Sequence, residues 1–218
     1  KRLFKRLWQT LIPIFAYIVS VGFDKITGKL KNESQARYRA KQLTALLVEL
    51  GPAFVKAGQA LSTRPDIIPV VLLEELSQLQ DQLPGFSGDK AMELIEKDLD
   101  KNINDIFLKI DKDPISAASL GQVHKAILKD GEVVAVKVQR PGLREQITLD
   151  LYIVRNIAIW LKNNIGLIRS DLVALIDELG KRVFEEMDYI NEAENAEKFR
   201  DMHQKNIKIA VPKIYNEL

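Results

Sequence analysis

The sequence has no cysteine, only two histidines among its 218 residues, and neither an internal repeat nor a low-complexity tract. Without cysteine the chain can form neither disulfides nor thiolate metal sites, which is compatible with an intracellular compartment. What is present is 46% hydrophobic and 28% charged, a balance that lets the chain bury a real core as one or two units.

The net charge is only +2, but it is distributed unevenly. Residues 1–41 hold ten Lys and Arg against Asp24 and Glu33, so this part carries a local charge of +8 and the remainder about −6. This asymmetry predicts that the N-terminal part of the chain contacts an anionic surface.

The opening segment, residues 1–33, combines basic residues with an apolar run from Leu11 to Phe23. As a helix this run spans about 20 Å, short of the roughly 30 Å hydrocarbon core of a bilayer, which disfavours a membrane span. Basic residues beside Phe4 and Trp8 suit an amphipathic segment that lies on a membrane lipid surface. Docking on the protein's own core is the alternative. A nucleic-acid partner is not expected, because the basic residues are not interleaved with a stacking platform.

Residues 34–100 show the apolar spacing of helices, and Gly51-Pro52 marks the end of one helix and the start of the next. In the second of these helices Lys56 and Gln59 are three residues apart and share a face. By itself such a lysine is typical of a solvated surface. Further helices are predicted over 70–83 and 87–99, and a first strand over 104–110.

Residues 114–142 predict a small-residue loop followed by a β-hairpin that turns at Lys129-Asp130-Gly131. The loop has the length and the closing Gly-x-Val of a kinase glycine-rich loop, although Ser116 and Ala118 replace its first two glycines. Side chains alternate along a strand, so Lys137 and Ala135 share one face of the second strand. This pattern is typical of a clamp for nucleotide phosphates, and an ordinary hairpin with one solvated lysine is the alternative.

The acidic stretch from Glu185 to Glu192 allows two interpretations. In an unbroken helix Glu185, Asp188 and Glu192 form one stripe and Glu186 points elsewhere, as on a solvated helix face. Joint action of Glu186 and Asp188 requires a bend near residues 187–188. The spacing alone does not distinguish the unbroken helix from the bent one.

Four motifs, in this order along the chain, resemble the UbiB/ADCK family of atypical protein-kinase-like proteins. Lys56-Ala-Gly-Gln59 matches the KxGQ motif, and Pro114-Ile-Ser-Ala-Ala-Ser-Leu-Gly-Gln-Val123 resembles the alanine-rich loop. Glu186-Met-Asp188 matches the ExD motif, and Glu192-Ala193 matches the helix glutamate that pairs with the strand lysine. The resemblance covers the chain from about residue 35 to its end and is closest to cyanobacterial and chloroplast members.

The resemblance implies an α+β fold, in which a kinase-like N-lobe of a small antiparallel sheet and a long helix carries a helical N-terminal extension. The expected divisions are 1–33, 34–100 with the KxGQ helix, and 101–218 as the N-lobe. The residues that it assigns to catalysis are Lys137, Glu192, Lys56, Gln59, Glu186 and Asp188. The residues that it assigns to nucleotide binding are Ser116, Ala117, Ala118, Ser119, Gly121, Val123, Ala135 and Lys137.

The implied cofactor is ATP or ADP with Mg²⁺. Neither H-x-D…N nor Asp-Phe-Gly occurs in the sequence, so the base and the metal ligands are expected in a C-lobe outside this chain, which alone should not turn over ATP. Family membership further implies isoprenoid quinone or prenyl-lipid metabolism, with prenyl-lipids and quinone-biosynthesis proteins as partners, at a thylakoid or plastid membrane or plastoglobule. The alternatives are a catalytically silent nucleotide or lipid sensor and a membrane-surface scaffold.

Overall fold

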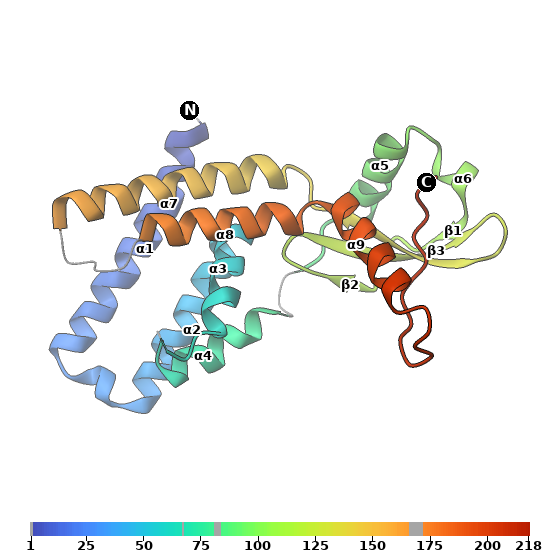
Figure 1. Ribbon diagram of the computed structural model, residues 1–218. Coiled ribbons are helices and arrows are strands. Elements are labelled where there is room, and N and C mark those ends of the chain that lie inside the picture. The colour runs from blue at the N-terminus through green and yellow to red at the C-terminus, as the bar shows by residue number, and fades with distance from the viewer. Residues whose placement is uncertain (1, 67, 81–83, 166–171) are drawn as a thin grey trace.

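The computed structural model describes residues 2–66, 68–80, 84–165 and 172–218 (Figure 1). Its helices, with two short 3₁₀ turns, are α1 (Arg2–Ile26), η1 (Lys29–Lys31), α2 (Glu33–Leu50), α3 (Pro52–Ser62), α4 (Val70–Ser77), η2 (Gln78–Gln80), α5 (Gly88–Leu99), α6 (Ile103–Ile106), α7 (Leu143–Ile165), α8 (Leu172–Glu186) and α9 (Tyr189–Met202). Its strands are β1 (Phe107–Ile110), β2 (Ser116–Ala117), β3 (Gly121–Leu128) and β4 (Val133–Gln139). A helical part and a sheet lie at opposite ends of the molecule (Figure 1). The predicted α+β class with a small antiparallel sheet is confirmed.

The sheet is built around β3, which pairs antiparallel with β1 and β2 on one edge and with β4 on the other. The hairpin from β3 to β4 turns where Asp-Gly predicts it, and Gly131 takes the positive φ of +92° that glycine tolerates best. Val134, Val136 and Val138 pack into one core cluster beneath α5, which leaves Lys137 on the opposite face of β4. Period-two alternation is thus confirmed for this strand.

The predicted strand over residues 104–110 is wrong in its first half. Residues 103–106 form the short helix α6, and β1 begins only at Phe107. The cause is local, because the side chain of Asn102 accepts a hydrogen bond from the main-chain N–H of Asn104 at 2.9 Å. This capping contact favours a helical turn at the site where apolar residues alone indicated a strand.

A second core cluster joins the helical part to the sheet. It contains Phe54 of α3, Ile147 of α7, Val183 of α8 and Met187, and Leu120 from the loop between β2 and β3 packs among them. Leu120 is only 6% exposed. The loop that the sequence assigns to phosphate binding is therefore anchored by a buried leucine in the helical part of the fold.

Helix α1 is longer than its apolar run, with 25 residues or about 37 Å. By length and composition it could cross a membrane, and 11% of its most apolar window is buried within the protein. The apolar run measured in the sequence analysis is only part of the helix, which also includes the residues before Leu11 and after Phe23.

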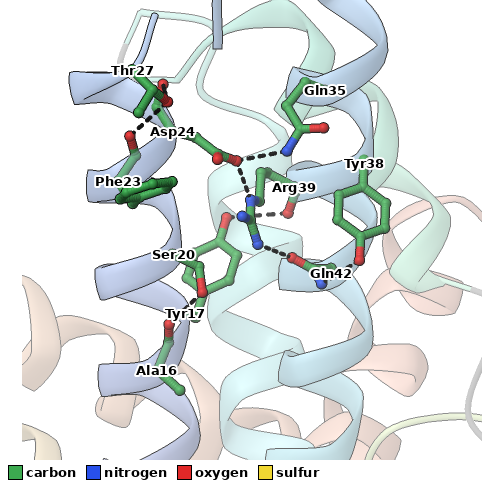
Figure 2. Close-up of polar contacts among 10 residues, drawn as sticks. All are labelled: Ala16, Tyr17, Ser20, Phe23, Asp24, Thr27, Gln35, Tyr38, Arg39 and Gln42. Carbon is green, nitrogen blue, oxygen red and sulfur yellow. Dashed lines mark hydrogen bonds and ion pairs between the residues drawn. The ribbon is translucent and has the colours of Figure 1, made fainter. Parts of the chain in front are cut away.

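Helix α1 is fastened to α2 through a buried carboxylate (Figure 2). Asp24 is 2% exposed and accepts hydrogen bonds from Nε of Arg39 at 2.6 Å and from Nε2 of Gln35 at 2.7 Å. The hydrogen bond from Arg39 holds the pKa of Asp24 below its usual range. Tyr17 adds a hydrogen bond from its hydroxyl to the carbonyl oxygen of Arg39, at 3.2 Å. The C-terminal half of α1 is thus held against the protein by polar contacts on its inner face.

Candidate functional site

A cleft of about 740 Å³ opens where the loop between β2 and β3, strand β4 and the ends of α8 and α9 meet. It is lined by Lys56, Ser116, Ala118, Ser119, Leu120, Gly121, Gln122, Val123, Lys137, Arg182, Glu185, Glu186, Tyr189, Asn191, Glu192 and Asn195. All four sequence motifs contribute side chains and so meet at this one place, although Lys56 and Glu192 are separated by more than half of the chain.

The loop forms one wall of the cleft. Ser116 lies opposite Val123 in the β2–β3 register, and the main-chain N–H of Ala118 donates to the carbonyl oxygen of Gly121 at 2.8 Å. Residues 118–121 therefore make a tight turn, and Ser119 within it is only 5% exposed. The turn closes without the first two glycines of a kinase loop.

Lys137 on β4 reaches across the cleft to α9. Its Nζ lies 2.6 Å from Oε2 of Glu192, and the two side chains are 44% and 56% exposed. An ion pair this open to water contributes little to stability, at most about 1 kcal/mol. It does hold an ammonium group at a defined place where an anionic ligand can reach it.

Tyr189 lies under Lys137 and is a site residue that the sequence analysis missed. The ammonium of Lys137 is 4.3 Å from the centre of the Tyr189 ring, a cation–π contact. Burial, reinforced by the negative charge of Glu192, raises the pKa of Tyr189 to about 12, and its buried hydroxyl has no hydrogen-bond partner among the described residues. A signal for it exists in the sequence, because Tyr189 precedes Glu192 by three residues and shares its helix face.

Gly121 allows this close approach of α9 to the sheet. A Cβ atom at this position would lie 2.6 Å from the Tyr189 hydroxyl and 2.6 Å from the main-chain carbonyl oxygen of Val138. The second contact is with the backbone of the paired strand, which cannot move aside. Glycine is therefore required at residue 121 by packing, whatever the ligand.

The acidic stretch bends at residues 187–188, as joint action of Glu186 and Asp188 would require. Helix α8 ends at Glu186, and the side chain of Asp188 caps α9 by accepting from the main-chain N–H of Asn191 at 2.9 Å. Gln139 fixes the bend to β4 with a hydrogen bond to the Met187 carbonyl oxygen, at 2.9 Å. Glu186 is thereby directed to Lys56, with which it forms an ion pair along the side of the cleft.

Four of the predicted site residues lie elsewhere. Gln59 donates from its Nε2 to the carbonyl oxygen of Leu79 at 3.0 Å, so it holds helix α3 to the segment after α4. Asp188 caps α9, and the Ala117 side chain alternates away from the cleft. Ala135 lines a separate hollow, beside Tyr215, that meets the cleft at Lys137. Their assignment to catalysis or nucleotide binding remains a prediction.

The described residues do not hold a metal site of their own. No group of three or more His, Asp or Glu side chains in this part of the chain is arranged to bind a metal ion. The carboxylates that line the cleft, Glu185, Glu186 and Glu192, are each paired with a lysine. That magnesium ligands come from a C-lobe remains a prediction.

Comparison with known proteins shows the family. The model of the ABC1 atypical kinase-like domain matches residues 78–218, which is more than half of the chain. The chain belongs to the ABC1 family of atypical kinase-like proteins. The predicted family is thus confirmed, and the cleft lies in the ABC1 domain, with Lys56 reaching it from the helices that precede the matched residues.

Curated relatives extend the match over most of the chain. The chloroplast protein ACTIVITY OF BC1 COMPLEX KINASE 3 of Arabidopsis thaliana is 42% identical, over 97% of this chain and 30% of that protein. The chloroplastic aarF domain-containing protein kinase At1g71810 of the same plant is 49% identical, over 86% of this chain and 27% of that protein. A protein of Synechocystis, sll0005, is 49% identical over 96% of this chain and 30% of its own length. The chain therefore spans about a third of the length of these relatives.

A solved structure shows the same fold. Rv3197 of Mycobacterium tuberculosis, in complex with erythromycin, superposes with a TM-score of 0.50 at 32% sequence identity, over 84% of this chain and 46% of that chain. The similarity supports the kinase-like α+β architecture, and it extends beyond the residues that the ABC1 domain covers.

Proposed function

We propose that this ABC1 domain is the nucleotide-binding lobe of an atypical kinase or ATPase, and that the cleft under the 118–121 turn receives the phosphates of ATP or ADP. The observation that carries the proposal is the ion pair of Lys137 with Glu192 at 2.6 Å, facing the turn across one cleft. A lysine that a glutamate holds beside such a loop neutralises the negative charge of nucleotide phosphates. Phosphoryl transfer needs this charge neutralisation more than covalent chemistry from the protein.

The ion pair of Lys56 with Glu186 supports an additional role for the KxGQ helix. Lys56 is 20% exposed on its side chain and lies at the side of the cleft, where helix α3 meets the end of α8. By the resemblance to the UbiB/ADCK family, a helix at this position is expected to cover the side on which a kinase would receive a peptide. We propose that the site acts on something other than a protein substrate, and that Lys56 keeps it closed on this side.

Nucleotide-dependent melting of the full-length protein tests the nucleotide proposal. At about one hundred times the dissociation constant, ATP or ADP should raise the melting temperature by about 5 °C, because binding to the folded state stabilises it. The titration is run with and without Mg²⁺, and radiolabelled phosphate release then separates an ATPase from a silent sensor. No shift with either nucleotide, in either condition, would overturn the proposal.

A second function, attachment to an anionic membrane surface, is favoured by helix α1. The residues of α1 that are buried are polar, namely Thr10 and Asp24, whereas its outward face carries large apolar side chains. These exposed residues recur every three or four positions: Leu3, Phe4, Trp8, Ile12, Phe15, Ile18, Val19, Phe23 and Ile26. Exposed basic residues flank the stripe at both ends, at Arg2, Lys5, Lys25, Lys29 and Lys31. The arrangement suits a helix that lies in the membrane interface, not across it.

Substitution of two aromatic residues on this stripe tests the attachment. The double variant Trp8→Ser with Phe15→Ser should weaken binding to phosphatidylglycerol-containing vesicles by at least about tenfold, because each removes exposed apolar area that the interface would bury. The fold should be unaffected, since these side chains are 51% and 69% exposed. Leu108→Ser, an exposed apolar residue on β1, is the control. If the double variant and the wild type sediment equally with the vesicles, α1 does not attach the protein to the membrane.

We also propose a metabolic role and a membrane location for the protein. The family resemblance supports a role in isoprenoid quinone or prenyl-lipid metabolism, with prenyl-lipids or quinone-biosynthesis proteins as partners. Curated relatives from Arabidopsis are named chloroplastic, which supports a plastid or thylakoid membrane as the surface that α1 contacts.

A further inference from the structure

Arg140, the residue after β4, holds the carbonyl side of the 118–121 turn. Its Nε and Nη2 donate hydrogen bonds to the carbonyl oxygen of Ala118, at 3.1 and 2.9 Å. Its main-chain N–H donates to the carbonyl oxygen of Leu120 at 3.0 Å. Nη2 donates a further bond to the carbonyl oxygen of Pro84 at 2.7 Å. One residue thus ties the turn both to the sheet and to the segment that precedes α5.

No carboxylate among the described residues balances the charge of Arg140. Among the described residues the guanidinium contacts only carbonyl oxygens and the ring of Phe86, whose centre is 5.9 Å away. Burial lowers the pKa of Arg140 from its usual value, and a guanidinium so placed still keeps its proton at neutral pH. An uncompensated positive charge therefore lies directly behind the turn, while the side chain itself stays out of the cleft.

The N–H side of the turn meets no hydrogen-bond acceptor among the residues that the structure describes. Ser119 and Leu120 are 5% and 6% exposed, and in the part of the chain that the structure describes their main-chain N–H groups make no hydrogen bond. The peptide between Ala118 and Ser119 is trans, so its N–H points away from the carbonyl oxygen that Arg140 holds. Two successive unpaired N–H groups in a turn form an anion-binding concavity, and this turn lines the cleft.

We propose that Arg140 is a positioning residue for phosphate binding: its side chain holds the carbonyl oxygen of Ala118 on its own side and so presents the N–H of Ser119, next to the N–H of Leu120, to the nucleotide. The inference rests on the proposed nucleotide function and adds the residue that orients the loop for phosphate binding. It also accounts for a turn that binds phosphate without the first two glycines. A fixed side-chain contact supplies the peptide orientation that glycine would otherwise allow.

The test compares phosphate-dependent with phosphate-independent affinity, by titration calorimetry of ATP, ADP and adenosine on the full-length protein. Arg140→Met should weaken ATP and ADP binding by about tenfold and leave adenosine within about twofold of the wild type. Arg140→Lys keeps the charge but not the planar fork, so it should lose about threefold for ATP. Arg144→Met, which removes an equal charge on α7 without touching the turn, is the matched control and should bind ATP normally.

The outcomes are distinct. A phosphate-selective loss in Arg140→Met, with normal behaviour of Arg144→Met, supports the inference. Equal losses for ATP and adenosine would make Arg140 a purely structural tie and overturn it, as would unchanged ATP binding in both Arg140 variants. If the wild-type protein binds none of the three ligands, the nucleotide function itself fails, and this is seen before any variant is compared.

Discussion

Replacing Lys137 by methionine is expected to weaken ATP binding by about 30-fold while leaving the protein folded. The ammonium is half exposed and its ion pair with Glu192 is open to water, so the free energy of unfolding should fall by less than about 1 kcal/mol. A phosphate in the cleft would instead lose a charge-assisted hydrogen bond, which is the stronger kind. Calorimetric titration with ATP and urea unfolding of the same sample measure the two quantities.

Two further variants sharpen this result. Glu192→Gln should cost only about fivefold in ATP affinity, because the glutamate orients the lysine and does not itself face phosphate. Lys125→Met removes an exposed lysine from β3 in the same sheet, outside the cleft, and should change nothing. If Lys137→Met and Lys125→Met bind ATP alike, and as tightly as the wild type, the cleft is not the phosphate site.

Replacing Asp150 by asparagine is expected to lower the free energy of unfolding by about 3 kcal/mol. Asp150 on α7 is 1% exposed and accepts two hydrogen bonds from Arg6 of α1, at 2.6 and 2.8 Å. The same guanidinium donates to the carbonyl oxygen of Leu50, so it joins three helices at one point. Removing the carboxylate leaves a largely buried cation without its counter-charge, and urea unfolding measures the cost.

The matched control is an ion pair between α7 and α8. Arg155 of α7 and Asp177 of α8 form an ion pair of similar geometry at 2.7 Å, but both side chains are about half exposed. Asp177→Asn should therefore cost less than about 1 kcal/mol. A second Arg6→Met substitution in the Asp150→Asn background should recover part of the loss, because it removes the unpaired charge. Similar costs for Asp150→Asn and Asp177→Asn would show that burial does not govern these pairs.

Local sequence patterns were sufficient for much of the architecture. Alternation along residues 133–139 predicts which valines enter the core, and Asp-Gly predicts the hairpin, because both depend on neighbours within a few residues. Apolar spacing predicts the helix over 34–50 for the same reason. It failed at residues 104–106, where one asparagine cap outweighed the apolar pattern.

The candidate site was less accessible to such reasoning. The motifs name Lys137, Glu192 and the loop, and these do gather at one cleft. They do not reveal Tyr189 beneath the lysine or Arg140 behind the turn, since each acts through partners far away in the chain. Nor do they separate Glu186, which reaches the cleft, from Asp188, which caps a helix.

By itself the sequence determined the family, the strand and helix periods, and the charged residues available for a phosphate. Only the tertiary structure decided which of them meet: the bend after Glu186, the packing of α9 on Gly121, and the inward polar and outward apolar faces of α1. The physical reason is the distance along the chain over which each interaction acts. Side-chain period and capping act over a few residues, whereas burial and ion pairing depend on which distant helices the fold brings into contact.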